Sequence, residues 1–171
     1  MTRPTNGEDG DVDTPRDVRD DHDVRDVTVN DIAAVLDAEN LEYRIEEADA
    51  GPGEPTRTVL RTGFVNAAMV FAFDDGRLVF ESVWRGEFTP MDASSLLFAV
   101  NEYNQTRFAP TLRFFQSEEN TLVITGIRSL DVSQGLSDDQ LGSFVVTSID
   151  ATLQAFDFLA ESFPTAVTWE E

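Results

Sequence analysis

Hydrophobic and polar residues alternate along this chain with two different periods, which predict a series of helices and strands. A spacing of three to four residues is typical of an amphipathic helix, and strict alternation is typical of a half-buried strand. Helical spacing begins near residues 28, 89 and 137, with strand-like runs between. The predicted order is α-β-β-β-β-α-β-β-α, an α+β fold in which helices flank an antiparallel sheet.

The first helix is predicted to begin at Thr28 or Asn30, since either side chain can cap a helix. Asn40 tolerates the left-handed conformation and is its predicted end. The run LEYRIEE then alternates as a half-buried strand does, with Leu41, Tyr43 and Ile45 inward. The run ADAGPGEPT contains two Gly and two Pro and predicts a loop.

The clearest strand signal is RTVLRTGF followed by NAAMVFAFDDGRLVFESVW. Asp75-Gly76 fits the two central positions of a type I′ hairpin turn. That turn pairs Phe73 with Leu78, Phe71 with Phe80 and Met69 with Ser82, which puts the larger apolar side chains on one face. The other face, of smaller side chains, can tolerate water: Val70, Ala72, Val79 and Val83.

A second helix is predicted to start at Thr89, with Pro90 at its first position and Asp92 completing a capping box. Phe98 and Glu102 are predicted to face outward. Two more strands follow, APTLRFF and TLVITGIR. The residues expected on the inward face of this helix are Ala93, Leu96, Leu97, Val100, Tyr103, Asn104 and Arg107.

The longest helix begins at the capping box Ser137-x-x-Gln140 and ends at Pro164. Its apolar arc is wider than one contact with a sheet requires, because Val146 and Phe158 flank the main stripe. The surplus favours either a second contact surface or a helix sunk deeply in its own domain. For the first alternative, the candidate interaction surface consists of Trp84, Val146, Leu153 and Phe158.

Uncharged polar residues gather where the second helix meets the next strand, in NEYNQTRFAPTLRFF. A buried amide without a hydrogen-bond partner costs roughly 1–3 kcal/mol. Asn101 and Asn104 are therefore predicted to bond to the backbone of this connection. The alternative is a polar ligand pocket. The complete candidate corner, for either role, is Asn101, Tyr103, Asn104, Arg107, Pro110 and Arg113.

Composition divides the 171 residues into one domain, residues 28–165, between two tails. Residues 1–27 contain nine acids, four arginines and no aromatic residue. Such a segment cannot offset its ordering entropy by burial, which predicts a disordered acidic tail. Residues 166–171 form a short C-terminal tail.

The net charge of −21 changes the expected partners. All 12 basic residues are Arg, and they do not cluster along the sequence. Nucleic-acid affinity depends on cations that replace phosphate counterions, so we expect no binding to nucleic acid or to an anionic membrane. No apolar run approaches the roughly 20 residues of a membrane span, and the first residues lack an apolar signal core. The expected location is the cytoplasm.

Candidate catalytic chemistry is sparse. The chain has no Cys, and its one His, His22, lies in the acidic tail, so no thiol, metal or Ser-His site is predicted. The pairs Glu118-Glu119 and Asp138-Asp139 lie in a hairpin loop and in a helix's first turn, where solvated carboxylates make poor proton shuttles. The sequence predicts no enzyme and no cofactor, with a hydrolase only as a reserve hypothesis.

The polar connection and the last helix resemble the YbjN family, bacterial proteins often labelled sensory transduction regulators. The resemblance covers residues 28 to 165. Tyr103 stands where Trp is commoner. The resemblance to this family implies a fold similar to type III secretion chaperones, usually a homodimer. It implies no catalytic residue and no cofactor. The matching residues are Asn101, Glu102, Tyr103, Asn104, Pro110, 111–115, Gly135, Leu136, Ser137, Gln140, Leu141, Phe163 and Pro164.

We therefore expect a cytosolic, non-enzymatic, homodimeric interaction module that regulates or chaperones an unidentified protein partner. The alternative is a small-ligand sensory domain that uses the polar corner around Asn101, Asn104 and Arg107.

Overall fold

A computed structural model describes residues 23–49 and 51–169. The predicted order of helices and strands is confirmed, with two short 3-10 turns added. The elements are α1 Val29–Ala38, β1 Arg44–Ala48, β2 Arg57–Phe64, β3 Ala67–Asp74, β4 Arg77–Trp84, η1 Pro90–Asp92, α2 Ala93–Thr106, β5 Thr111–Gln116, β6 Leu122–Asp131, α3 Asp138–Ser162 and η2 Pro164–Ala166.

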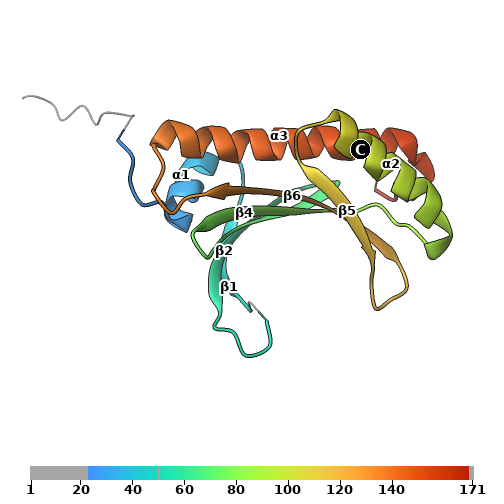
Figure 1. Cartoon of the computed structure of the whole chain (residues 1–171), viewed down its shortest axis with the longest axis horizontal. Coiled ribbons are helices and arrows are strands. Elements are labelled where there is room, and N and C mark those ends of the chain that lie inside the picture. The colour runs from blue at the N-terminus through green and yellow to red at the C-terminus, as the bar shows by residue number, and fades with distance from the viewer. Residues whose placement is uncertain (1–22, 50, 170–171) are drawn as a thin grey trace, which may run out of the picture.

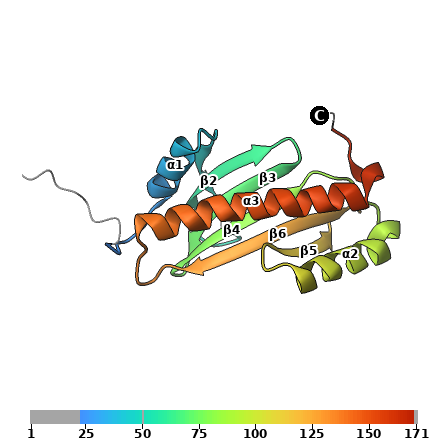
Figure 2. The ribbon, with the colours of Figure 1, turned by 90° about the horizontal axis from the view of Figure 1, so that it is seen from above.

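Six antiparallel strands form one sheet in the order β1-β2-β3-β4-β6-β5. The long helix α3 crosses one face of this sheet (Figure 1). Figure 2 shows α1 beside the N-terminal part of α3 and α2 beside its C-terminal part. No described helix covers the opposite face, toward which the β1–β2 and β5–β6 hairpins curve (Figure 1). We call this opposite face the outer face.

The central hairpin has the predicted register. Phe73 pairs with Leu78, Phe71 with Phe80 and Met69 with Ser82. Asp75 and Gly76 both have positive φ, 42° and 74°, as a type I′ turn requires. The sheet face toward α3 therefore carries the large apolar side chains.

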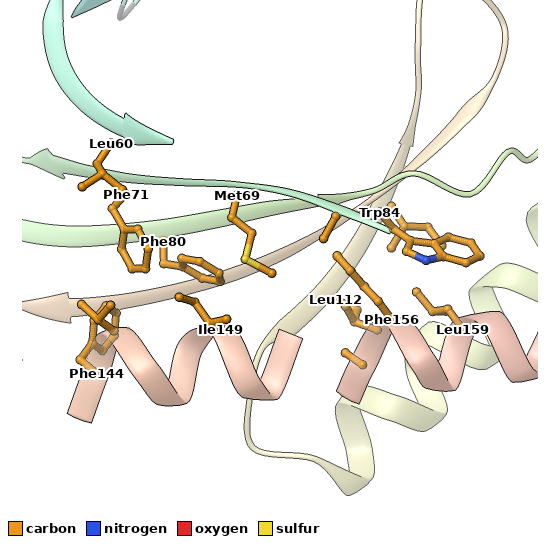
Figure 3. Close-up of a cluster of buried hydrophobic side chains, with 14 of the residues drawn as sticks. Leu60, Met69, Phe71, Phe80, Trp84, Leu112, Phe144, Ile149, Phe156 and Leu159 are labelled. Atoms are coloured by element: carbon orange, nitrogen blue, oxygen red, sulfur yellow. The ribbon is translucent and has the colours of Figure 1, made fainter. Parts of the chain in front are cut away.

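The core lies between that face and α3 (Figure 3). The rings of Phe71 and Phe80 are 4.8 Å apart and fully buried. Ile149, Phe156 and Leu159 meet them and their neighbours from α3, on the predicted stripe. Each such side chain contributes roughly 1.5–3 kcal/mol when fully buried, so the contact between α3 and the sheet dominates the fold's stability.

Capping side chains mark the starts of α1, of η1 before α2, and of α3. The backbone N–H groups of Thr28, Thr89 and Ser137 donate to the side chains three residues later, Asp31, Asp92 and Gln140. Thr28, not Asn30, is the cap of α1. Pro90 begins the 3-10 turn η1 that leads into α2. Asn40 follows α1 with φ 56°, as predicted.

Both ends of the fold extend beyond residues 28–165. Most of the predicted acidic tail lies outside the described residues, but Arg25 exchanges two backbone hydrogen bonds with Leu136, of 3.0 and 2.9 Å. At the other end, Ala166 is buried and the Trp169 ring lies edge-on to Trp84 at 5.8 Å. Neither tail boundary was visible in the sequence, because these contacts join residues far apart along it.

Four predicted inward positions are exposed instead: Ile45, Leu97, Asn104 and Arg107. Ile45 lies on the edge strand β1, whereas α1 packs against β2 and β3. Leu97 lies on the outer side of α2, because Leu96 and Val100 already fill the contact between this helix and the core.

Candidate functional site

The predicted polar corner forms in part, at the junction of α2 and β5. The Asn104 amide donates to the carbonyl of Leu112 at 2.7 Å and accepts from its N–H at 2.8 Å. The hydroxyl of Tyr103 donates to the carbonyl of Ala109 at 2.9 Å. These bonds hold the end of α2 against the start of β5, which is the backbone bonding predicted for Asn104.

Asn101 behaves differently from its neighbour. It is exposed, and none of the side-chain hydrogen bonds in the described part of the chain involves it. One turn of helix separates it from Leu97 and Phe98, so it lies between them on the outer side of α2. The prediction that Asn101 bonds to backbone is wrong, because its side chain points away from the connection.

The other predicted corner residues separate. Pro110 is buried near Gly126. Arg113 lies on the outer face of the sheet, since alternate residues of a strand point to opposite faces. There it donates to Thr125 at 3.3 Å and lies 3.7 Å from a Glu81 oxygen. Arg107, the residue after α2, is exposed and lines a cleft between α2 and α3.

This α2–α3 cleft has a volume of about 630 Å³. Arg107 and Arg128 line it with aromatic side chains, and Glu102 and Asp150 also belong to its walls. A cleft with two guanidinium groups and aromatic walls can hold a small organic anion, although the two carboxylates limit the net charge that it accepts. Its aromatic members are Tyr103, Phe108 and Phe158.

Arg128 is the unusual residue of the cleft. Its guanidinium donates to the hydroxyls of Thr147 and Ser148, at 2.8 and 3.2 Å, and lies 5.1 Å from the centre of the Phe144 ring. Burial lowers its pKa. Among the described residues, no carboxylate oxygen lies within 4.0 Å of its nitrogens. The partly buried guanidinium of Arg128 is thus held by neutral groups alone. The spacing of residues along the sequence does not indicate this environment.

The predicted interaction surface on α3 is mostly covered. Trp84 is only 2% exposed and packs against Phe88 at 5.4 Å, so its assignment to a free surface is wrong. Val146, Leu153 and Phe158 are half-buried. Phe158, for example, packs against Tyr103 of α2 at 5.7 Å. Contacts with α1 and α2 therefore use most of the surplus apolar surface of α3.

The three most exposed large apolar side chains lie on α2 or next to its ends, together with Leu97. Leu97 is 51% exposed, Phe98 72%, Met91 93% and Phe108 96%. We call these four residues the α2 ridge. A sequence signal existed for its centre, because adjacent Leu97 and Phe98 cannot both face the core from one amphipathic helix.

The described residues offer little for catalysis. They contain no group of three or more His, Asp or Glu side chains arranged to hold a metal ion. Of the two carboxylate pairs, Glu118-Glu119 lies exposed in the β5–β6 turn. Asp138 accepts a hydrogen bond from Arg25 at 2.7 Å at the start of α3. Both places suit solvated or ion-paired carboxylates.

A scan of the described helices for membrane-spanning character finds none with the required length and hydrophobicity.

Comparison with known proteins places the chain in a family. The family model described as "Putative bacterial sensory transduction regulator", YbjN, matches residues 28–161. No curated protein matches. The crystal structure of YbjN from E. coli, titled a putative transcription regulator, superposes with a TM-score of 0.64 at 16% identity, covering 83% of this chain and 96% of that one. An uncharacterized protein from Methanothermobacter thermautotrophicus gives a TM-score of 0.50 at 18% identity, covering 77% and 96%. At these low identities the two solved structures establish the fold alone. The family model matches most of the chain, and the chain therefore belongs to the YbjN family.

Proposed function

We propose that the protein is a non-enzymatic interaction module that works as a homodimer and regulates or chaperones another protein. The observation that carries this proposal is the α2 ridge. Its four large apolar side chains are each more than half exposed: Leu97 and Phe98 lie within α2, Met91 lies in η1 just before it, and Phe108 lies just beyond its end. Exposed apolar clusters of this kind are typical of protein-interaction sites.

A second copy of the chain fits the ridge well. In a two-fold dimer the same patch contacts itself, so an apolar patch is self-complementary while a charged one is not. A net charge of −21 makes most of the surface repel a second copy. The four residues of the α2 ridge are uncharged, and among the exposed neighbours of Phe98 on α2 is one acid, Glu102, one turn away, so the apolar side chains favour the ridge as the contact.

The test is the molar mass of the protein in solution, measured by light scattering for the wild type and for Phe98→Glu. We expect the wild type at twice 19.0 kDa and the variant at 19.0 kDa. Phe115→Glu is the matched control, because Phe115 is also exposed but lies on the sheet, away from α2. A wild-type monomer, or dissociation by the control variant to the same extent, would overturn the proposal.

A small-ligand sensory function is the second candidate, and Arg128 favours it. A guanidinium kept partly buried without a carboxylate suits a ligand that brings its own negative charge. A thermal-shift screen with small organic acids tests this function. A ligand at 100 times its Kd adds about 2.7 kcal/mol of stability, and Arg107→Gln should abolish the shift. An unchanged shift in this variant would place the ligand elsewhere.

A further inference from the structure

The outer face of the sheet gathers most of the described arginines. Cross-strand partners share a face of a sheet. The strand register therefore places five arginines on the outer face. Arg85 directly follows β4, and continuing the alternation of that strand places it on the same face. Six of the nine described arginines therefore lie on the outer face. They are Arg44, Arg57, Arg61, Arg77, Arg85 and Arg113.

This clustering was invisible along the sequence, where the arginines are widely spaced. It also corrects the expectation that they do not cluster. The same face carries five acids, Glu42, Glu46, Asp74, Glu81 and Asp131. The outer face thus has an excess of one positive charge in a protein whose net charge is −21.

Three of the arginines converge at one end of the outer face. Arg44 and Arg61 are direct cross-strand partners, an arrangement in which like charges repel. A guanidinium nitrogen of Arg85 lies 3.7 Å from the position that a Cβ atom would occupy at Gly63. Together with Gly63 and Ala68, these side chains line a hollow of about 370 Å³. We call this group the arginine hollow.

The arginine hollow is poorly neutralised. Arg61 forms an ion pair with Glu46, whereas no ion pair of Arg44 or Arg85 occurs among the described residues. Glu42 is the other acid that lines the hollow. Small apolar side chains continue from it across the sheet, and Ala68 and Val83 are exposed there. The surface therefore combines unpaired guanidinium groups with an apolar floor.

We propose that the outer face binds an acidic, extended segment of a partner protein, whose carboxylates meet the arginine hollow and whose small apolar side chains cover Ala68 and Val83. Charge complementarity selects this occupant. A second copy is disfavoured, since two-fold pairing would bring this net positive face against itself. Nucleic acid is disfavoured too, because five acids interrupt the arginines and the floor is apolar. This surface is separate from the α2 ridge, so it does not depend on dimerisation.

The test is fluorescence anisotropy of a labelled peptide of alternating Glu and Val, titrated with the full chain. We expect binding that weakens with added salt and is at least about tenfold weaker in the double variant Arg44→Gln/Arg85→Gln. Arg25→Gln is the matched control, because it removes one arginine from the helical side, where it pairs with Asp138 at the start of α3, and should leave the Kd unchanged. Circular dichroism checks that all variants are folded.

Four results would overturn the proposal: no binding of the peptide, equal binding of a Lys-Val peptide, equal loss in Arg25→Gln, or tighter binding of a single-stranded oligonucleotide that the double variant abolishes. A fifth would reassign the surface: binding that appears only after deletion of residues 1–22 means that the chain's own acidic segment occupies it. Dimer formation through α2 is measured separately and affects none of these outcomes.

Discussion

Two asparagines three residues apart have different environments. Asn104 exchanges two hydrogen bonds with the backbone of Leu112. Asn101 lies on the exposed side of α2 beside Phe98. Asn104 is itself largely exposed, so its contribution comes from the paired bonds and not from a buried amide. A ligand role for both amides together loses its basis, because they do not face the same space.

Replacing Asn104 with Ala removes both of these bonds and leaves the N–H and carbonyl of Leu112 without them. We expect the free energy of unfolding to fall by about 1–3 kcal/mol, as measured by urea denaturation. Asn101→Ala is the control and should change it by less than about 0.5 kcal/mol. Equal effects of the two substitutions would contradict the assignment.

Two glycines should respond oppositely to the same substitution. A Cβ at Gly86 would lie 2.2 Å from the ring of Trp84, which is buried and cannot move aside. A Cβ at Gly142, within α3, meets nothing within 4 Å. We expect Gly86→Ala to destabilise the protein by roughly 1–3 kcal/mol. Gly142→Ala should stabilise it by about 0.5–1 kcal/mol. Thermal unfolding of both variants measures this difference, and the same sign for both would refute the packing described around Trp84.

At the scale of elements, strand and helix periods predicted the fold well. The type I′ turn fixed the register of the central hairpin, and three caps marked the helix starts, because these signals are local. Contacts between distant segments were not predictable. The bridge of Arg25 to Leu136 and the packing of Trp169 on Trp84 depend on how the ends of the chain meet the sheet and α3.

The candidate site was predictable to a smaller extent. The brace at Asn104 followed from the chemistry of one helix end. The α2 ridge was missed because Leu97 was assigned to the core, and Trp84 was assigned to the surface although Phe88 and Trp169 cover it. The grouping of arginines on the outer face can be recognised only when two things are known: which face each strand residue points to, and how the strands pair.

Arg25 joins the starts of α1 and α3 through its ion pairs with Asp31 at 2.8 Å and Asp138 at 2.7 Å. The hydrogen bond from Arg25 holds the pKa of Asp31 below its ordinary value of 3.8. A carboxylate with a lowered pKa stabilises the folded state above its ordinary pKa, and that contribution is lost as the pH falls further.

We therefore expect Arg25→Gln to lower the free energy of unfolding at pH 6 by about 1 kcal/mol or less, since these groups are partly exposed. The difference from the wild type should shrink as the pH falls below about 4, because the carboxyls become protonated in both proteins. Urea denaturation at pH 6 and pH 3 measures it. A difference that grows at low pH would contradict the ion-pair account.

At the scale of the whole molecule, the three helices and the core occupy one side of the sheet, and two kinds of surface remain free. The α2 ridge is apolar and uncharged. The outer face is positively charged in a strongly acidic protein. This separation supports the proposal that the protein acts by contact with other chains.

The most direct test of that account asks whether α2 is covered in solution. The chain has no cysteine, so Asn101→Cys places a single thiol in the middle of the α2 ridge. Its rate of reaction with a maleimide should fall as the protein concentration rises, because a second copy covers the ridge. Thr111→Cys, at an exposed position on the sheet, should react at a constant rate. A rate at Asn101→Cys that is independent of protein concentration would contradict the central claim.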